Sequence, residues 1–271
     1  MHYRLLGNSG LRVSELCLGT MTCGEDWGQG ANKHEAKRIF DAFLAAGGNF
    51  IDTANHYTNG TSERLLGEFI QSERDHVVVA TKYTLVMEQG KVNSAGNHRK
   101  NLMQSIHGSL KRLHTDCIDV LWVHAWDFMT PVAEVMRALD DVVRAGHVLY
   151  VGISDTPAWI VAQANTLADL RGWTPFVGLQ LQYNLIERTA ERELLPLAQA
   201  FDLAVLAWSP LAMGVLSGKY RQPQQPGEPR CWGETGAGGL QDMFLNDRSL
   251  RIADEVVTMA QELGHSPSQV A

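Results

Sequence analysis

The sequence predicts an α/β fold, a (β/α) barrel rather than an open doubly wound sheet. Short apolar segments alternate with amphipathic ones along the chain, as expected where parallel strands alternate with helices. The strand-like segments are apolar without interruption, which is typical of strands covered on both faces. No linker or change of composition divides the chain, so we expect a single domain over residues 1–271. An open dinucleotide-binding sheet would carry Gly-x-Gly-x-x-Gly after an early strand, and we find no such motif.

The first quarter of the chain predicts a hairpin followed by strand–helix units. Two short segments, Tyr3–Leu5 and Arg12–Val13, flank the turn residues 7–10 and predict a small N-terminal hairpin. The next elements are a strand over Leu16–Thr20, a polar loop over 22–31, a helix capped by Asn32 and ending at Ala46, a strand over Phe50–Asp52, and a helix that starts at Ser62.

The same alternation continues through five further strands. In chain order we expect a strand over Val77–Thr81, a helix over 97–113, a strand over Ile118–Val123, a helix over 131–144, a strand over Tyr150–Ile153, a helix opened by Pro157, a strand over Val177–Gln182, a helix over 190–201 and a strand over Ala204–Trp208. A long loop over about 209–247 then precedes a helix over Leu250–Leu263.

Composition excludes several classes of protein. The net charge of −7 argues against a general nucleic-acid surface, which needs a basic excess. No apolar run approaches the roughly 20 residues of a membrane span, and the N-terminus lacks the apolar core of a signal peptide. The four cysteines have no metal-ligand or disulfide spacing, so we expect buried free thiols, no metal, and a cytoplasmic protein. Nothing in the sequence indicates an oligomeric state.

Polar residues collect at the ends of the predicted strands. Asp52, Lys82 and His124 end three successive strands, and Tyr57 lies in the loop after the first of them. In a (β/α) barrel the carboxyl ends of all strands meet at one face, where active sites lie. Each residue alone has an ordinary structural interpretation. Four acid–base groups at one barrel mouth favour a functional one, because buried charge is expensive unless it is paired or used.

These four groups suit proton transfer to an oxygen atom. A phenol has a reference pKa of about 10, and a neighbouring ammonium lowers it. Asp52 would hold Lys82 in place, and His124 could donate a hydrogen bond to the same oxygen that Tyr57 protonates. No nucleophile or metal motif appears, so we expect hydride to come from an organic cofactor.

At this point the sequence resembles the aldo-keto reductases. The resemblance is carried by Gly19-Thr20-Met21, Asp52-Thr53-Ala54 with Tyr57, Ala80-Thr81-Lys82, Val123-His124, Gly152-Ile153-Ser154-Asp155, Gln180 to Asn184, and Trp208 to Gly214 with Leu216 to Tyr220. These motifs occur in order over essentially the whole chain. The run from Trp208 is most similar to the aryl-alcohol-dehydrogenase-like and potassium-channel-β-like branches of that family.

The resemblance implies a (β/α)8 TIM barrel whose N-terminal hairpin closes the bottom. It also implies NADP(H)-dependent reduction of aldehydes or ketones, reversible toward the alcohol. It implies that Tyr57 is the general acid, that Asp52 and Lys82 tune it, and that His124 orients the carbonyl. The cofactor residues implied are Thr20, Met21, Asp52, Ser154, Asp155, Gln180, Trp208, Ser209, Pro210, Leu211, Gly214, Ser217, Lys219 and Arg230. Family members more often carry Asn at the position of Asp155, and Lys219 could equally be a solvated surface charge.

The substrate should be a small carbonyl compound or alcohol, with no nucleic acid or membrane partner. The bulky residues expected to line its site are Trp27, Tyr57, Tyr83, His124 and Trp126, with Trp232 a further candidate. They favour aromatic or extended apolar substrates. The alternative is a cofactor-sensing or partner-binding module on the same fold with vestigial activity. The family's eighth strand and helix would follow Ala271, so we expect the eighth unit to be missing from this chain.

Overall fold

The computed structural model describes residues 1–221 and 244–271. Two antiparallel strands, β1 (Tyr3–Leu5) and β2 (Arg12–Ser14), form the expected hairpin. Seven further strands form one sheet in sequence order. They are β3 (Cys17–Gly19), β4 (Phe50–Asp52), β5 (Val78–Tyr83), β6 (Ile118–Val123), β7 (Val148–Ser154), β8 (Phe176–Gln182) and β9 (Ala204–Trp208).

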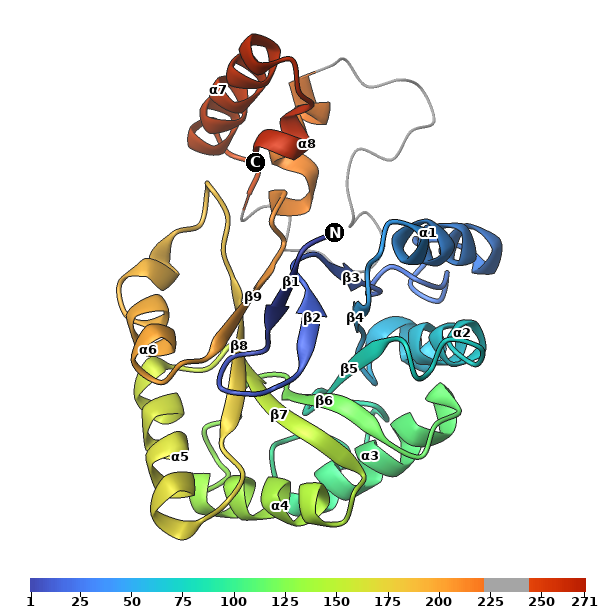
Figure 1. The fold of residues 1–271 in the computed structure, drawn as a ribbon, viewed down its shortest axis with the longest axis vertical. Helices are drawn as coiled ribbons and strands as arrows, with labels where there is room; N and C mark the ends of the chain where they lie inside the picture. The colour runs from blue at the N-terminus through green and yellow to red at the C-terminus, as the bar shows by residue number, and fades with distance from the viewer. Residues whose placement is uncertain (222–243) are drawn as a thin grey trace. The chain divides into compact units, whose positions relative to one another are not determined.

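Helices follow the strands, and neighbouring strands from β3 to β8 pair in parallel, so the (β/α) barrel architecture is confirmed. The helices are α1 (Lys33–Ala45), α2 (Thr61–Phe69), α3 (Arg99–Leu113), α4 (Val132–Arg144), α5 (Ala158–Arg171), α6 (Leu194–Ala200), α7 (Asp247–Leu263) and α8 (Pro267–Val270). Figure 1 shows α1 to α5 on one face of the sheet and the hairpin on the other. Short 3₁₀ turns lie at Tyr57–Gly60, Thr189–Glu191, Ala212–Ser217 and Lys219–Arg221.

Several boundaries differ from the sequence prediction because of local capping. The side chain of Asn32 accepts from the backbone N–H of Glu35 and starts α1 as expected. His98 caps α3 by accepting from the N–H of Asn101, so that helix begins two residues later than predicted. Asn246 caps α7 by accepting from the N–H of Ser249, which starts that helix three residues earlier.

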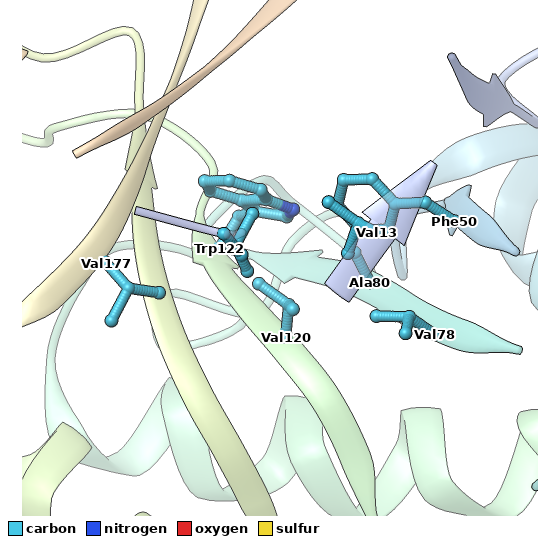
Figure 2. Packing of buried hydrophobic residues seen from close by; sticks show 8 residues of the cluster. Val13, Phe50, Val78, Ala80, Val120, Trp122 and Val177 are labelled. Carbon is cyan, nitrogen blue, oxygen red and sulfur yellow. The ribbon is translucent and has the colours of Figure 1, made fainter. Parts of the chain in front are cut away.

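The inward face of the sheet is the face that packs against the hairpin. It is apolar along the strands and polar at their carboxyl ends. Phe50, Ala80 and Trp122 belong to a buried cluster with residues of the hairpin, and Figure 2 shows these side chains gathered with Val13 of β2. Successive side chains of a strand point to opposite faces, so residues two positions further share the inward face. Those residues are Asp52, Lys82 and His124. The alternation therefore places three of the predicted catalytic groups directly above the apolar core.

Trp122 fills the interior because two neighbouring strands carry glycine beside it. In the register of the sheet, Trp122 pairs with Gly152, and Gly152 pairs with Gly178. A Cβ atom at Gly152 would lie 2.2 Å from the Trp122 ring, and one at Gly178 would lie 2.9 Å from it. The partner of successive β7 residues jumps from Phe176 to Gly178, so β8 contains a bulge that keeps Gly178 opposite Gly152.

The chain divides into two compact units. The first comprises Met1–Gln180 and Glu193–Leu206, and the second comprises Leu181–Arg192 and Ala207–Ala271. The second unit has a buried cluster of its own, formed by Ile186, Ala212, Val215, Leu216, Phe244, Ala253 and Val256. Arg248 of α7 donates to the carbonyl oxygen of Ile186 at 3.1 Å within this unit.

Three of the four cysteines lie among the described residues, and each of these is a free thiol that is half-buried. Burial raises the pKa of Cys23 to about 11. Cys231 lies outside the described residues. Among the helices that the structure describes, none combines the length and the apolar character that crossing a bilayer requires.

Candidate active site

Lys82 is the centre of the polar cluster. It lies near the end of β5 and its side chain is almost fully buried. Its ammonium nitrogen contacts the Asp52 carboxylate, donates to the carbonyl oxygen of Thr53 at 2.9 Å, and donates to the Tyr57 hydroxyl at 3.0 Å. An ammonium has three N–H donors and no acceptor. All three donors of Lys82 are therefore engaged.

Asp52 accepts from two sides. Its Oδ2 atom pairs with Lys82, and its Oδ1 atom accepts from the side-chain amide of Gln180 at 3.1 Å. Gln180 lies on β8, far from Asp52 in sequence, and both side chains are buried. The Asp52 carboxylate is thus held between the Lys82 ammonium and the Gln180 amide. A carboxylate fixed in this way also fixes the ammonium whose charge it balances.

Tyr57 reaches the cluster from the loop after β4. Its ring lies 4.7 Å from the Lys82 ammonium and edge-on to the His124 ring, with centroids 5.8 Å apart and planes at 82°. The phenol, the ammonium, the carboxylate and the imidazole therefore lie within one cluster. Their separation in sequence is bridged by the parallel strands β4, β5 and β6.

Four buried polar atoms of the first unit have no hydrogen-bond partner among the described residues, and two of them lie just beyond or at the ends of neighbouring strands, β6 and β7. These two are the Nδ1 atom of His124 and the hydroxyl oxygen of Ser154, and the other two are the Oδ1 atom of Asn55 and the Nε1 atom of Trp122. Val123 pairs with Ile153, so His124 and Ser154, one residue further on each strand, lie at the same level of the sheet. Buried polar atoms in folded proteins are nearly always paired, so a pair of unpartnered ones at a barrel mouth indicates a place for a ligand.

Burial controls the protonation of the cluster. Burial raises the pKa of the Tyr57 phenol, and the Lys82 ammonium, which acts to lower it, offsets only part of that effect. Burial by itself would lower the pKa of Lys82, but the charge of Asp52 and the hydrogen bonds to Asp52 and Tyr57 raise it overall. Burial, together with the charges of Lys82 and His56, holds the pKa of His124 well below its usual value. The pKa of Tyr57 is thus raised overall, although the ammonium alone would lower it.

The chain matches the family model described as "Aldo/keto reductase family" over residues 15–271. It is 39% identical to an aryl-alcohol dehydrogenase [NADP(+)] of Phanerodontia chrysosporium over 97% of this chain and 71% of that protein.

The chain belongs to the aldo/keto reductase family. It is also 46% identical to norsolorinic acid reductase stcV of Emericella nidulans over 76% of this chain and 56% of that protein. Its identity to the aldo-keto reductase ausK of Aspergillus calidoustus is 42%, over 78% of this chain and 57% of that protein.

The cofactor residues predicted in the first unit of this aldo/keto reductase differ in their exposure and in their hydrogen bonds to the rest of the protein. Thr20 is buried and its hydroxyl donates to the carbonyl oxygen of Asp52 at 3.0 Å, so it points into the protein. Met21 is half-buried. The side-chain amide of Gln180 donates a hydrogen bond to the Asp52 carboxylate. Asp155 is exposed, has a positive φ of 41°, and donates its backbone N–H to Gln180.

The remaining predicted cofactor residues belong to the second unit or lie beyond the described residues. Ser217 donates to the carbonyl oxygen of Gly214 at 2.7 Å, and a Cβ at Gly214 would lie 2.6 Å from the Lys219 side chain. Lys219 is exposed and its ammonium lies 5.0 Å from the centroid of the Tyr220 ring. The other members of this set are Trp208, Ser209, Pro210 and Leu211, of which Pro210 is exposed and the others are half-buried. Arg230 and Trp232 lie outside the described residues.

The aromatic residues predicted to line the substrate site of this family member separate into two groups. Trp27 is half-buried and its ring lies 5.7 Å from that of His56, next to Tyr57 in sequence. Trp126 is buried in the loop after β6. Tyr83 is fully buried and donates its hydroxyl to the carbonyl oxygen of Asn97 at 3.2 Å. Because Lys82 faces inward, Tyr83 points to the opposite face of β5, away from the polar cluster.

Sequence reasoning did not find the supporting contacts. The carbonyl oxygen of Thr53 and the hydroxyl of Ser62 carry no motif of their own. A signal for Ser62 was present, since it is a serine in the first turn of α2 with apolar residues on the same face. No run of local sequence could show that its hydroxyl bonds to both the oxygen atoms of Thr20.

Proposed function

We propose that this aldo/keto reductase interconverts carbonyl compounds and alcohols, aromatic ones in particular, with NADP(H) as hydride carrier and Tyr57 as proton donor. The observation that carries the proposal is the contact between Lys82 and Tyr57. The ammonium donates to the Tyr57 oxygen at 3.0 Å, and a hydrogen bond has one donor. The phenolic hydrogen is thus left to point elsewhere, toward a substrate oxygen.

The charges of the cluster suit an acid that gives up its proton only in the reaction. The raised pKa of Tyr57 keeps the phenol protonated at neutral pH. When the proton leaves, a phenolate forms beside an ammonium that is already hydrogen-bonded to it, so that ammonium stabilises charge where it develops. Asp52 keeps the ammonium charged and in place. Lys82 and Asp52 thereby act on the transition state more than on the resting acid.

His124 suits the role of orienting the carbonyl. The lowered pKa makes its ring neutral at pH 7, and a neutral imidazole offers one N–H donor and one acceptor. Its ring lies edge-on to Tyr57, so both side chains can approach one substrate oxygen. Trp27 and Trp126 supply apolar surface, which supports an aromatic substrate. The similarity to an aryl-alcohol dehydrogenase supports the same choice.

The residues present fit a nicotinamide carboxamide. That group carries one N–H₂ donor and one carbonyl acceptor, and the unpartnered hydroxyl of Ser154 can satisfy either. Gln180 and Asp155 lie next to it at the end of β8 and after β7. When bound, NADPH supplies the hydride. For the part of the cofactor beyond the nicotinamide, the residues at 208–219 and Arg230 stay predictions. The relative named for NADP(+) supports the phosphorylated form of the cofactor.

The proposal is tested by NADPH consumption with 4-nitrobenzaldehyde, comparing the native chain with Tyr57→Phe. We expect kcat to fall by about a hundredfold or more, since general acid catalysis contributes roughly that factor. NADPH binding, measured by quenching of tryptophan fluorescence, should change by less than about twofold. Tyr3→Phe is the matched control, because that tyrosine is an exposed hairpin residue bonded to Gly47.

Activity that survives Tyr57→Phe would remove the phenol from the acid role. NADPH binding by the native chain without turnover of any aromatic aldehyde or alcohol would instead favour the cofactor-sensing module.

A further inference from the structure

Tyr57 is followed by three residues in the left-handed region of backbone conformation. Thr58 has φ 44° and ψ 46°, Asn59 has φ 54° and ψ 34°, and Gly60 has φ 85°. Glycine and asparagine adopt this region readily, but a β-branched residue there is a rare outlier. Thr58 is therefore the strained position of this turn, and it is the direct neighbour of the proposed acid.

Two hydrogen bonds of its hydroxyl hold the Thr58 side chain in place. It is fully buried, and its hydroxyl donates to the carbonyl oxygen of Cys23 at 2.7 Å and accepts from the backbone N–H of Ser62 at 3.0 Å. A Cβ at Gly24 would lie 2.9 Å from the same hydroxyl oxygen, so the side chain packs closely against that glycine. The strain persists because these surroundings define the position of the side chain.

Ser62 connects this anchor to the strands that carry the proposed catalytic groups. Its hydroxyl donates to the carbonyl oxygen of Thr20 at 2.8 Å and lies 2.9 Å from the hydroxyl oxygen of Thr53. The carbonyl oxygen of Thr53 in turn accepts from Lys82. Hydrogen bonds that are joined through Ser62 and Thr53 thus link the residue beside Tyr57 to the ammonium that its phenol contacts.

We propose that Thr58 is a positioning residue, whose buried hydroxyl anchors the left-handed turn and so sets the Tyr57 phenol against Lys82. The inference rests on the proposed role of Tyr57. The Tyr57 side chain is only half-buried, so packing alone does not fix it, and the direction in which it leaves the backbone depends on the turn. A glycine would adopt this turn without strain, whereas threonine adds a hydroxyl that ties the turn to Cys23 and Ser62.

The test is the substitution Thr58→Val, which keeps the β-branched shape and removes the hydroxyl. We expect kcat for aromatic aldehyde reduction to fall by about tenfold or more, because small misplacements of a reacting group lower rates strongly. KM should change by less than about twofold, and the solvent deuterium isotope effect on kcat should rise as proton transfer slows. Thr58→Ser, which restores the hydroxyl, should recover most of the lost rate.

Thr61→Val is the matched control, because Thr61 is the first residue of α2 and its hydroxyl accepts from Arg64 at 2.6 Å in an exposed hydrogen bond. Equal kcat and equal isotope effects in Thr58→Val and Thr61→Val would overturn the inference, and so would a Thr58→Ser enzyme as slow as Thr58→Val. If Thr58→Val does not fold, Thr58→Ala takes its place and is assessed in the same way.

The Tyr57→Phe enzyme separates the two levels of argument. If Tyr57→Phe is active, the proposed function fails. If Tyr57→Phe is inactive and Thr58→Val keeps the native kcat, the positioning role alone is wrong.

Discussion

Replacing Gly152 with alanine should destabilise the protein by an amount that follows from its distance to Trp122. The added Cβ would lie 2.2 Å from the indole ring, and ordinary contact begins at 3.4 Å. The difference, 3.4 − 2.2, requires the fully buried ring to move by about 1.2 Å. Overpacking of this kind costs about 3 kcal/mol, which corresponds to a decrease in Tm of roughly 6 to 12 °C for a chain of this size.

The assay is thermal unfolding followed by circular dichroism, with two further glycines for calibration. Gly178→Ala brings its Cβ to 2.9 Å from the same ring and should cost about 1 kcal/mol. Gly10→Ala meets no atom within 4 Å and should change stability by less than about 0.5 kcal/mol. In a Trp122→Leu background, Gly152→Ala should cost little, because the ring it displaces has gone. The reasoning would be refuted if Gly152→Ala had the same Tm as Gly10→Ala. It would also be refuted if Gly152→Ala cost as much stability in the Trp122→Leu background as in the native chain.

Three further predictions concern the site and its support. Lys82→Met should raise the pKa of Tyr57 further, since the ammonium lowers it, and should reduce kcat by about a hundredfold. Phenolate absorbance, with Tyr57→Phe as the reference, measures the pKa, and steady-state kinetics measure kcat. An unchanged rate would contradict the tuning role. The depressed pKa of His124 means that the unfolded chain binds a proton below about pH 6.5 that the folded chain does not. Stability to urea should therefore fall between pH 7 and pH 5, and His124→Gln should flatten that slope; a slope unaffected by the substitution would refute the assignment. Asn97→Ala should lower the free energy of unfolding by about 1 to 3 kcal/mol, because its side chain accepts from the N–H of Asp127 at 2.7 Å and donates to Thr84 and Ala125; urea unfolding measures it, and a change no larger than that of Gly10→Ala would contradict it.

Strand order and the inward position of the polar groups could be predicted from the sequence. Continuous apolar strands separated by helical segments indicate a parallel barrel, and the order β3 to β9 follows. The period of two along a strand relates Asp52, Lys82 and His124 to the apolar residues two positions before them. The same period predicts that Tyr83 faces away from Lys82. Its place at the substrate site stays a prediction, and this alternation argues against it.

Other features depend on contacts between distant segments that no local pattern records. The Trp122 ring fits only because Gly152 and Gly178 come from two later strands. The pKa of Tyr57 depends on burial as well as on the ammonium, and burial is a property of the folded chain. The left-handed conformation of Thr58 was not expected, because a β-branched residue gives no signal for it.

The division of the inward face into an apolar floor and an ionisable rim has a consequence for how such enzymes diversify. Each of β4, β5 and β6 contributes its acid–base group at the last inward position, two residues beyond a packed side chain. On the proposed function, exchanging one rim residue should alter reactivity while the packed side chains beneath it stay in place. Redesign toward a new reaction can therefore begin at three positions while the packed cluster beneath them is left unchanged.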